Sequence, residues 1–375
     1  MTVHDRGSSA ASRQPDSGRT DAEKAAFETA FEKAVAATMP TSGPLVDTFG
    51  RVHTDLRVSL TDRCNLRCTY CMPAEGLDWL PSRHLLQPDE LIRLMNLGVT
   101  RLGITDVRFT GGEPLLARHL EDVVAAAASL RPRPEIALTT NGLGLARRAA
   151  ALVAAGLDRI NVSLDTVDRA HFAEITRRDR LPDVLDGLAA VKKSGMDPIK
   201  VNAVLDPKIS GADVVNLLRF CLQHGYQLRV IEMMPLDADR QWSRDAGLNA
   251  ERVLEVLQEN FRLRSDPAPR GSAPAELWLV EEGPDTPAGK VGIIASVSRP
   301  FCGACDRTRL TADGQIRNCL FAGDETDLRA LLRSGADDDA VEQAWRAAMW
   351  VKKAGHGIND PGFIQPDRTM SSIGG

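Results

Sequence analysis

The feature that most constrains the fold is a regular alternation of short strands and helical segments between residues 55 and 233. Six segments have the composition of β-strands, at residues 56–60, 107–110, 136–140, 160–164, 200–204 and 228–233. Helical stretches lie between them, at residues 88–97, 120–130, 145–155, 182–194 and 213–224. Consecutive β/α units build a parallel sheet, either doubly wound or curled into a barrel. No GxGxxG turn follows the first strand, which weakens the dinucleotide-binding alternative.

Four of these strands carry polar residues on the face opposite their apolar one. The polar pairs are Arg57 and Ser59, Arg108 and Thr110, Asn161 and Ser163, and Lys200 and Asn202. Parallel strands that are buried on both faces usually form continuous apolar runs, and a closed eight-stranded barrel fills its interior with Val, Ile and Leu. We therefore expect helices to cover the apolar face, and the polar face to line a wet, cationic cavity that suits a large anionic ligand.

The charge balance limits the partners. The 375 residues include 46 Lys and Arg against 51 Asp and Glu, which gives a net charge of −5. We expect no nucleic-acid partner, because a nucleic-acid surface needs a basic excess, although a local cationic pocket remains compatible. No apolar run reaches the ~18 residues of a membrane span, and the first residues lack the apolar region of a signal peptide. The expected location is the cytoplasm, with no membrane partner.

Six of the seven cysteines form two groups of three. The first is Cys64, Cys68 and Cys71, directly after the first strand, and the second is Cys302, Cys305 and Cys319. Groups of odd number favour metal ligation over disulfides. The first, a CxxxCxxC, suits three irons of a 4Fe–4S cluster with the fourth iron open, because structural zinc normally has four ligands. For the second group the spacing leaves zinc and iron–sulfur open. Cys221 is expected to be a small buried residue.

The first cysteine group and a second motif together resemble the radical S-adenosylmethionine (SAM) superfamily. The matching residues are Tyr70 before the last cysteine and Gly111-Gly112-Glu113-Pro114 at the end of the second strand. The resemblance implies a partial (β/α)6 TIM-like barrel of the radical SAM type, in an α/β fold. It also implies that the glycine motif holds the amino group of SAM. Glycines allow close approach of a ligand to the backbone, and a carboxylate pairs with an ammonium group.

The second cysteine group, placed after such a core, resembles the GTP 3′,8-cyclase family of molybdenum cofactor biosynthesis. The resemblance spans about residues 45–375 and includes the segments 61–63, 72–73, 139–142, 161–165, 306–309 and the terminal Gly374-Gly375. It implies SAM contacts at Tyr70, Gly112, Glu113, Ser163 and Met234. It implies GTP contacts at Arg57, Arg108, Thr139, Lys200, Arg307, Thr308 and Arg309. The alternation of polar and apolar residues in the strands independently places Arg57, Arg108 and Lys200 on the inner face of the expected sheet.

The function implied by this resemblance is the conversion of GTP to 3′,8-cyclo-7,8-dihydroguanosine 5′-triphosphate. A 5′-deoxyadenosyl radical made from SAM at the first cluster would remove the hydrogen on carbon 3′ of GTP, and the ribosyl radical would add to carbon 8. The implied cofactors are two 4Fe–4S clusters and SAM, and the second cluster would hold the edge of the guanine. The implied partners are GTP, an electron donor and the downstream cyclic pyranopterin monophosphate synthase. A monomer or homodimer is expected.

Three parts of the chain are expected. Residues 1–45 form an N-terminal extension, disordered or partly helical, because residues 1–20 have a disorder-prone composition and Phe27, Phe31 and Val35 form a helical stripe after Asp21. Residues 46–265 form the partial barrel. Residues 266–375 form a C-terminal auxiliary iron–sulfur cluster domain, whose Gly-Gly tail enters the active site according to the resemblance.

Two alternatives belong to other functions. A radical SAM peptide-modifying enzyme with an auxiliary cluster would carry more C-terminal cysteines and leaves Arg307 and Arg309 unexplained. A non-catalytic iron–sulfur or zinc protein leaves the convergence of the polar strand ends unexplained. Glu232 lies on the opposite face of its strand from Arg229 and is expected to be structural, and no histidine has a metal-ligand spacing.

Overall fold

The structure, a computed structural model, describes residues 38–237, 239–240, 242–244 and 246–374. Six parallel strands follow one another in sequence order in one sheet. They are β1 (Asp55–Ser59), β2 (Asp106–Thr110), β3 (Glu135–Thr140), β4 (Arg159–Ser163), β5 (Ile199–Leu205) and β6 (Gln227–Glu232). All six strands expected from the sequence are thereby confirmed, with boundaries that differ by one residue.

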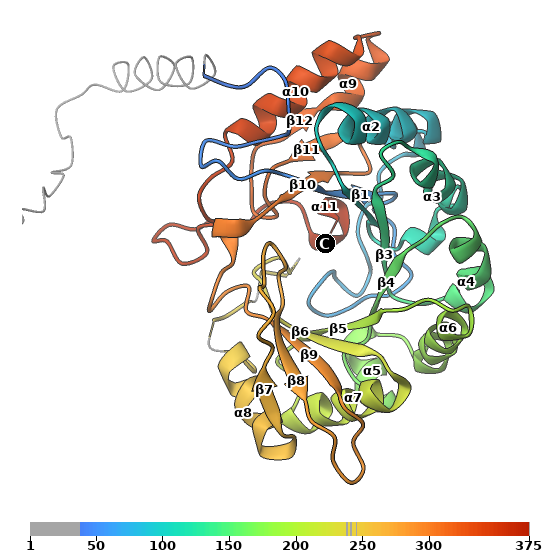
Figure 1. Cartoon of the computed structure of the whole chain (residues 1–375), viewed down its shortest axis with the longest axis vertical. Helices are drawn as coiled ribbons and strands as arrows, with labels where there is room; N and C mark the ends of the chain where they lie inside the picture. Colours follow the sequence, from blue (N-terminus) through green and yellow to red (C-terminus); the bar gives the residue numbers. More distant parts are fainter. Residues whose placement is uncertain (1–37, 238, 241, 245, 375) are drawn as a thin grey trace, which may run out of the picture. The chain divides into compact units, whose positions relative to one another are not determined.

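Helices connect these strands and cover the outer face of the sheet (Figure 1). They are α2 (Pro88–Arg101), α3 (Leu120–Ser129), α4 (Leu145–Ala154), α5 (Arg169–Thr176), α6 (Leu181–Lys193) and α7 (Gly211–His224), with short 3-10 turns η1 (Ser82–His84) and η2 (Pro114–Leu116). Helix starts are fixed by side chains: Ser210 and Asp213 form a capping box at the start of α7. The eight-residue α5 was not expected from the sequence.

The segment after residue 245 adds strands to both edges of the six-stranded sheet. Its elements are α8 (Ala250–Asn260), β7 (Leu263–Ser265), β8 (Glu276–Val280), β9 (Gly289–Ile294), η3 (Cys302–Ala304), β10 (Arg307–Leu310), β11 (Gln315–Arg317), β12 (Thr326–Asp327), α9 (Leu328–Arg333), α10 (Asp338–Trp350) and α11 (Met370–Ile373). Strand β9 pairs in parallel with β6, and β10 pairs in parallel with β1. The result is one twelve-stranded sheet, β12-β11-β10-β1-β2-β3-β4-β5-β6-β9-β8-β7.

Residues 40–375 form a single compact unit. The boundary expected at residue 265 therefore does not coincide with a division between compact units, because the later strands continue the sheet of the barrel. The helix expected at residues 21–39 lies almost wholly outside the described residues, as does most of the expected extension 1–45. None of the helices in the described ranges is long and apolar enough to cross a membrane.

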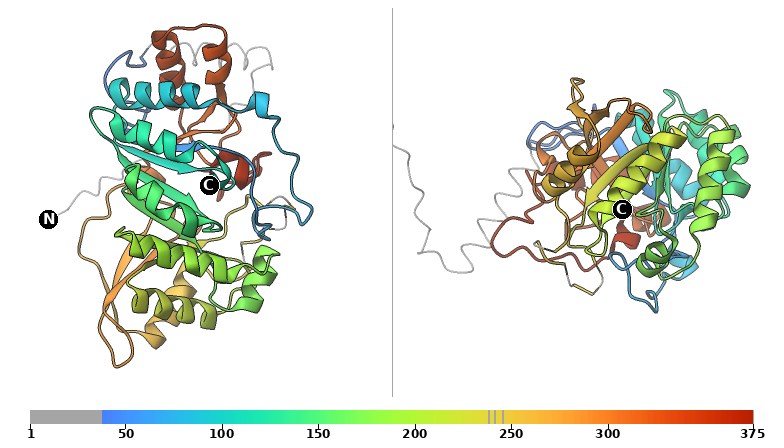
Figure 2. Two further views of the ribbon diagram at one scale, coloured as in Figure 1. Left: turned by 90° about the vertical axis from the view of Figure 1, so that its right-hand side faces the viewer. Right: turned by 90° about the horizontal axis from the view of Figure 1, so that it is seen from below.

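The apolar core lies between the sheet and its helices. Val58, Phe109 and Val162 are fully buried on the outer face of their strands, and Leu94 and Leu188 meet this face from helices α2 and α6. Each fully buried side chain of this size contributes roughly 1.5–3 kcal/mol to stability. The side chains that alternate with them belong to the inner face of the curved sheet. The turned views in Figure 2 show the helices on the opposite, outer side of the sheet. The core thus leaves the inner face free for a polar site.

Candidate active site

The inner face of the sheet surrounds a cavity of about 700 Å³. All six clustered cysteines line it, and so do residues from the ends of β1 to β6. Such a volume is in the range of small-molecule and cofactor sites, about 300–1,000 Å³. The hollow, cationic interior expected from the alternating strands is present, and it brings both cysteine groups to one space.

The first cysteine group lies on the loop that follows β1. Arg67 stiffens this loop: its guanidinium donates to the carbonyl oxygens of Cys64 and Leu66, both at 2.8 Å. The Asn141 amide lies 3.7 Å from the Cys64 sulfur. Burial, together with the neighbouring Cys64, raises the pKa of the Cys71 thiol to about 12. The three sulfurs are therefore close together and largely shielded from water.

Gly111 and Gly112 line the cavity, but packing against the cysteine loop explains why they must be glycines. A Cβ atom on Gly111 would lie 2.4 Å from the carbonyl oxygen of Thr61, and one on Gly112 would lie 2.3 Å from that of Arg63. The Gly112 amide donates to the Thr61 oxygen at 2.7 Å. No side chain fits at these distances, so the two glycines let the end of β2 dock directly beneath the cysteine loop.

Glu113 does not face the cavity, in contrast to the direct contact with SAM that the resemblance implied. Its side chain is fully buried, and its carboxylate accepts hydrogen bonds from the Thr140 hydroxyl (2.6 Å) and the backbone amides of Asn141 (2.7 Å) and Leu115 (2.9 Å). Burial raises its pKa to about 7 in spite of these donors. With its oxygens occupied, Glu113 joins the ends of β2 and β3 and positions the glycines rather than contacting a ligand.

The other residues expected to contact SAM line the cavity. These are Tyr70, Gly112, Ser163 and Met234. The Tyr70 hydroxyl donates to the Asp165 carboxylate at 2.9 Å, and the other oxygen of Asp165 accepts from the Val204 amide at 2.8 Å. Tyr70 thus links the cysteine loop to the ends of β4 and β5.

The second cysteine group lies at η3 and beyond β11, and basic residues surround it. The Lys352 ammonium lies 3.3 Å from the Cys305 sulfur, and the Arg307 guanidinium lies 3.6 Å from it. Burial raises the pKa of Cys305, but the charges of Lys352 and Arg307 outweigh burial and lower it below the usual thiol value. Arg51 donates to the Cys302 carbonyl at 2.8 Å. This environment favours a thiolate, the form that binds iron.

The three thiols of each cysteine group are near neighbours, since they raise one another's pKa. Among the described residues, no three His, Cys, Asp or Glu side chains converge on a point where one ion could sit. A 4Fe–4S cluster has no such requirement, because each thiolate binds a different iron. The residues of each group are therefore compatible with a 4Fe–4S cluster.

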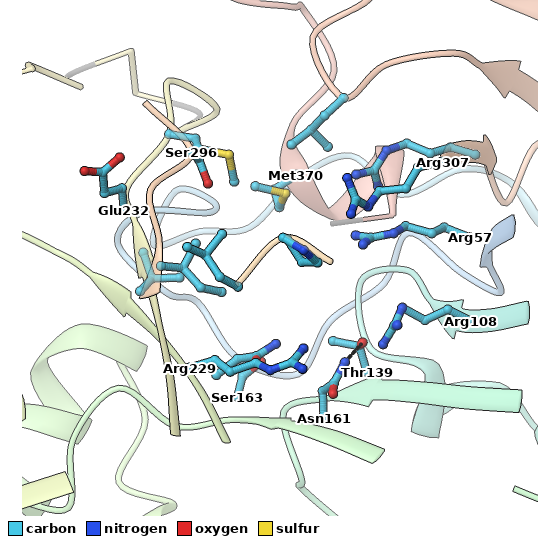
Figure 3. Close-up of a pocket in the computed structure, with 18 of the residues that line it drawn as sticks. Arg57, Arg108, Thr139, Asn161, Ser163, Arg229, Glu232, Ser296, Arg307 and Met370 are labelled. Atoms are coloured by element: carbon cyan, nitrogen blue, oxygen red, sulfur yellow. Dashed lines mark hydrogen bonds between the residues drawn. The ribbon is translucent and has the colours of Figure 1, made fainter. Parts of the chain in front are cut away.

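Arginines from adjacent strands point into the cavity between the two cysteine groups. Figure 3 shows Arg57, Arg108 and Arg307, from β1, β2 and β10, directed toward the same space. Burial and the neighbouring Arg307 and Arg108, partly offset by Asp55, lower the pKa of Arg57 to about 10. Arg108 forms no ion pair with any residue in the described ranges. This excess of buried positive charge suits a polyanionic ligand.

The C-terminal segment also reaches this cavity. The Gly374 carbonyl accepts a hydrogen bond from Arg309, and Gly375 lies outside the described residues. A Cβ atom on Gly374 would lie 2.4 Å from the Ser59 hydroxyl oxygen, and its φ of +71° is in the left-handed region. Glycine is therefore required at position 374 by both space and backbone conformation.

Two family models match the chain. The radical SAM superfamily matches residues 58–221, and the family described as Molybdenum Cofactor Synthesis C matches residues 226–358. A GTP 3′,8-cyclase of Mycobacterium marinum is 73% identical over 342 residues, which cover 91% of this chain and 95% of that protein. GTP 3′,8-cyclase 2 of Mycobacterium tuberculosis is 73% identical over 337 residues, which cover 90% of this chain and 94% of that protein. This chain belongs to the GTP 3′,8-cyclase family.

The fold of this family member is also found in more distant solved structures. SuiB of Streptococcus suis, in the crystal structure with S-adenosylmethionine, has a TM-score of 0.53 and 15% sequence identity, over 85% of this chain and 72% of that chain. That likeness concerns the fold. Membership of the radical SAM superfamily implies a 4Fe–4S cluster and SAM as cofactors. The family resemblance inferred from the sequence motifs is thereby confirmed.

Of the seven residues that the family resemblance assigns to GTP, five line the cavity. These are Arg57, Arg108, Thr139, Arg307 and Arg309. Thr308 does not: it alternates with its neighbours on β10, is fully buried, and accepts a hydrogen bond from the Trp345 indole at 3.0 Å. Its side chain therefore packs α10 on β10, and the expected contact of Thr308 with GTP stays a prediction.

Lys200 is also outside the cavity lining, although it lies on the inner face of β5. It shares that face with Asn202, which does line the cavity. Burial, together with the charges of Arg229, Arg159 and Arg108, lowers the pKa of Lys200 to about 7. Lys200 is thus close enough to these arginines to respond to an anion bound among them, although its side chain does not line the cavity.

Three cavity-lining arginines in this member of the family were missed by the sequence analysis. Arg229 on β6 forms no ion pair with the described residues, and its Nε atom has no hydrogen-bond partner. Arg159 on β4 pairs with Asp106 at 3.1 Å. Arg270 lies 5.2 Å from the ring of Phe301. The alternation used for the other strands would have found Arg229, because Leu228 and Val230 on either side of it are buried.

Glu232 has the structural role expected from the sequence. Its carboxylate accepts hydrogen bonds from the amides of Ala250 (2.9 Å), Val297 (2.8 Å) and Ser298 (2.8 Å). One side chain thus holds the end of β6, the start of α8 and the segment that leads to the second cysteine group.

Proposed function

We propose that this chain converts GTP to 3′,8-cyclo-7,8-dihydroguanosine 5′-triphosphate, the first step of molybdenum cofactor biosynthesis. The observation that carries the proposal is the shared cavity. Two groups of three cysteines line one space of about 700 Å³, with arginines between them, of which Arg108 and Arg229 form no ion pair with the described residues. The name of the relatives at 73% identity agrees with this chemistry.

The arginines between the cysteine groups are the proposed site for the triphosphate. Arg57, Arg108 and Arg229 present buried guanidinium groups, and a triphosphate carries about four negative charges that would compensate them. Arginine offers paired donors with the geometry of phosphate oxygens. Binding the anion relieves the mutual repulsion of these cations, so the site favours a highly charged anionic ligand.

The first cysteine group is the proposed site of the SAM-cleaving cluster. Cys64, Cys68 and Cys71 would hold it, and Ser163 and Met234 would contact SAM beside it. When bound, the cluster and SAM supply the radical chemistry that acts on carbon 3′ of the substrate. The chain itself orients the reactants and excludes water, because helices cover the sheet that surrounds the cavity.

The second cysteine group is the proposed site of a second 4Fe–4S cluster, held by Cys302, Cys305 and Cys319. Arg307 and Arg309 extend from the neighbouring strand β10 into the same cavity. They would neutralise negative charge on a substrate placed beside this group. An electron donor and the downstream cyclic pyranopterin monophosphate synthase are the proposed partners.

The decisive experiment is an anaerobic incubation of the reconstituted chain with SAM, GTP and a reductant. We expect 5′-deoxyadenosine and a cyclised nucleotide, with about eight irons per chain. Cys68→Ser should abolish both products. The matched control is Cys221→Ala, because Cys221 is fully buried in α7 away from the cavity and should leave both products intact. Normal SAM cleavage by the Cys68→Ser chain would refute the assignment of the first group.

The triphosphate site has a separate test. Arg57→Ala should raise the KM for GTP at least tenfold while sparing the slow cleavage of SAM without GTP, because the charged groups that act on Arg57 are Asp55, two arginines and Cys305 of the second cysteine group. Arg169→Ala, which removes an exposed ion pair with Asp179, is the control and should change neither activity. An equal loss of both activities in Arg57→Ala would show a folding defect instead.

A further inference from the structure

Lys352 occupies an unusual position just beyond the C-terminal end of α10. The residue is 3% exposed, and its ammonium group lies 3.3 Å from the Cys305 sulfur and 2.8 Å from the Arg307 carbonyl oxygen. Burying an ammonium group is costly unless an anion compensates it. In the described part of the chain no carboxylate forms an ion pair with Lys352. The sulfur of Cys305 is therefore its compensating partner.

The two cysteine groups differ in this respect. In the described ranges no lysine or arginine donates a hydrogen bond to a sulfur of Cys64, Cys68 or Cys71. The Cys64 sulfur instead lies 3.7 Å from the neutral side-chain amide of Asn141. The Asp165 carboxylate even adds negative charge near Cys68. The Arg67 charge favours the Cys64 thiolate but makes no hydrogen bond to its sulfur among the described contacts, whereas Lys352 and Arg307 contact the Cys305 sulfur directly.

The position of Lys352 is fixed from two sides. Arg51 donates to the carbonyl of Cys302 at 2.8 Å and to that of Lys353 at 2.7 Å, so it ties the cysteine segment to the segment that carries Lys352. Asp47 orients Arg51 through a 2.6 Å contact and accepts from His53 at 3.1 Å. Because these side chains are nearly or fully buried, the backbone on either side of the contact is fixed. The ammonium group of Lys352 is therefore held close to the Cys305 sulfur.

We propose that Lys352 is a positioning residue for the second cluster and raises its reduction potential through its contact with Cys305. This inference rests on the proposed second cluster. One-electron reduction adds a negative charge to a cluster that three thiolates already make anionic. A hydrogen bond from an ammonium group stabilises the reduced form more than the oxidised form, and donors to cluster sulfurs are known to set cluster potentials. The first cluster lacks this contribution.

The test is an anaerobic redox titration of the full-length reconstituted chain, followed by electron paramagnetic resonance. In Lys352→Met, which keeps the length of the side chain but removes the charge and the donor, the ratio of reduced to oxidised second cluster at a fixed potential should fall at least tenfold. For a one-electron couple a tenfold change equals a lower midpoint by about 59 mV. The signal of the second cluster is assigned with a full-length chain in which Cys64, Cys68 and Cys71 are alanine.

Two variants serve as controls. Lys353→Met removes the neighbouring exposed lysine and should leave both midpoints unchanged. Lys352→Arg keeps the charge and should restore most of the potential. If Lys352→Met fails to retain iron, Lys352→Gln, which keeps an N–H donor without the charge, should show a lowered midpoint in its place.

The outcomes separate this inference from the proposed function. A wild-type chain with about eight irons, and an unchanged second midpoint in a Lys352→Met chain with the same iron content, would overturn the inference and leave the proposed function standing. A wild-type chain that holds only about four irons would remove the second cluster, and the inference with it. An equal shift of both midpoints would also overturn it, since it would indicate a general change of structure.

Discussion

Lys200 should take up a proton when GTP enters the cavity. Its pKa is lowered to about 7 by burial and by the charges of Arg229, Arg159 and Arg108, against a usual value of 10.5. At pH 8 such a group is about 10% protonated. A triphosphate among these arginines adds negative charge and raises the pKa of Lys200 back toward its usual value, so binding at pH 8 should take up about 0.9 proton at Lys200.

The assay is isothermal titration calorimetry of the anaerobic reconstituted chain with GTP and without SAM. The observed enthalpy is measured in buffers with different enthalpies of ionisation, and the slope gives the number of protons. Lys200→Arg, which is charged throughout, and Lys200→Met, which never titrates, should both lose about 0.9 proton relative to the wild-type chain. Ionisation of GTP itself is common to all three chains and cancels in the difference.

The pH dependence has a definite sign. Below pH 7 Lys200 is already charged in the empty cavity, so at pH 6 its contribution to proton uptake should fall to about 0.1. Because the pKa in the folded chain lies below the unfolded value, protonation of Lys200 opposes folding, and its contribution to stability rises between pH 7 and 10.5. Equal proton uptake at pH 8 by the wild-type chain and both variants would refute this reasoning.

Three further variants test the glycines and the buried carboxylate. Gly112→Ala places a Cβ atom 2.3 Å from the Arg63 oxygen, so the first cluster should be lost and iron should fall from about eight to about four per chain; full iron content would contradict this. Glu113→Gln places a side-chain NH2 group opposite backbone N–H donors, so a hydrogen bond is lost. The free energy of unfolding in anaerobic urea denaturation should therefore fall by about 1–3 kcal/mol. An unchanged value would contradict the hydrogen bonding. Gly374→Ala meets Ser59 at 2.4 Å and should raise the KM for GTP several-fold while SAM cleavage without GTP persists; an unchanged KM would separate the tail from the site.

The barrel strands could be predicted because their signal is local. Within β1, β2 and β4 apolar and polar residues alternate, and this period of two is legible in five consecutive residues. Helix α5 lacked such a signal, because its eight residues span little more than two turns. Pairing of β10 with β1 was not predicted, since the contact joins distant parts of the chain and neither strand encodes its neighbour.

The site was predicted well where alternation was applied and less well where a motif was carried over whole. Arg57 and Arg108 were placed correctly on the inner face by alternation, and the same rule applied to β6 would have added Arg229. Thr308 was taken over with its neighbours as part of one motif, although alternation on β10 turns it toward Trp345.

The glycine motif shows a second limit of sequence reasoning. Gly112 and Glu113 were interpreted through a ligand, but their closest partners are the Arg63 carbonyl and the amide of Asn141. Those partners come from other segments of the chain. A motif indicates that a backbone approaches closely, but only the fold shows what approaches it.

The parallel pairing of β10 with β1 bears on the order in which the metal centres can assemble. Cys64, Cys68 and Cys71 sit within eight consecutive residues, so they can meet before the remainder of the polypeptide has found its place. Cys319 joins Cys302 and Cys305 across β10 and β11, and β10 is anchored by its pairing with β1, far earlier in the chain. Closing so long a loop is entropically costly and comes late in folding. Maturation in the cell is therefore expected to load iron at the N-terminal loop first, and to complete the other centre only after β10 has paired with β1.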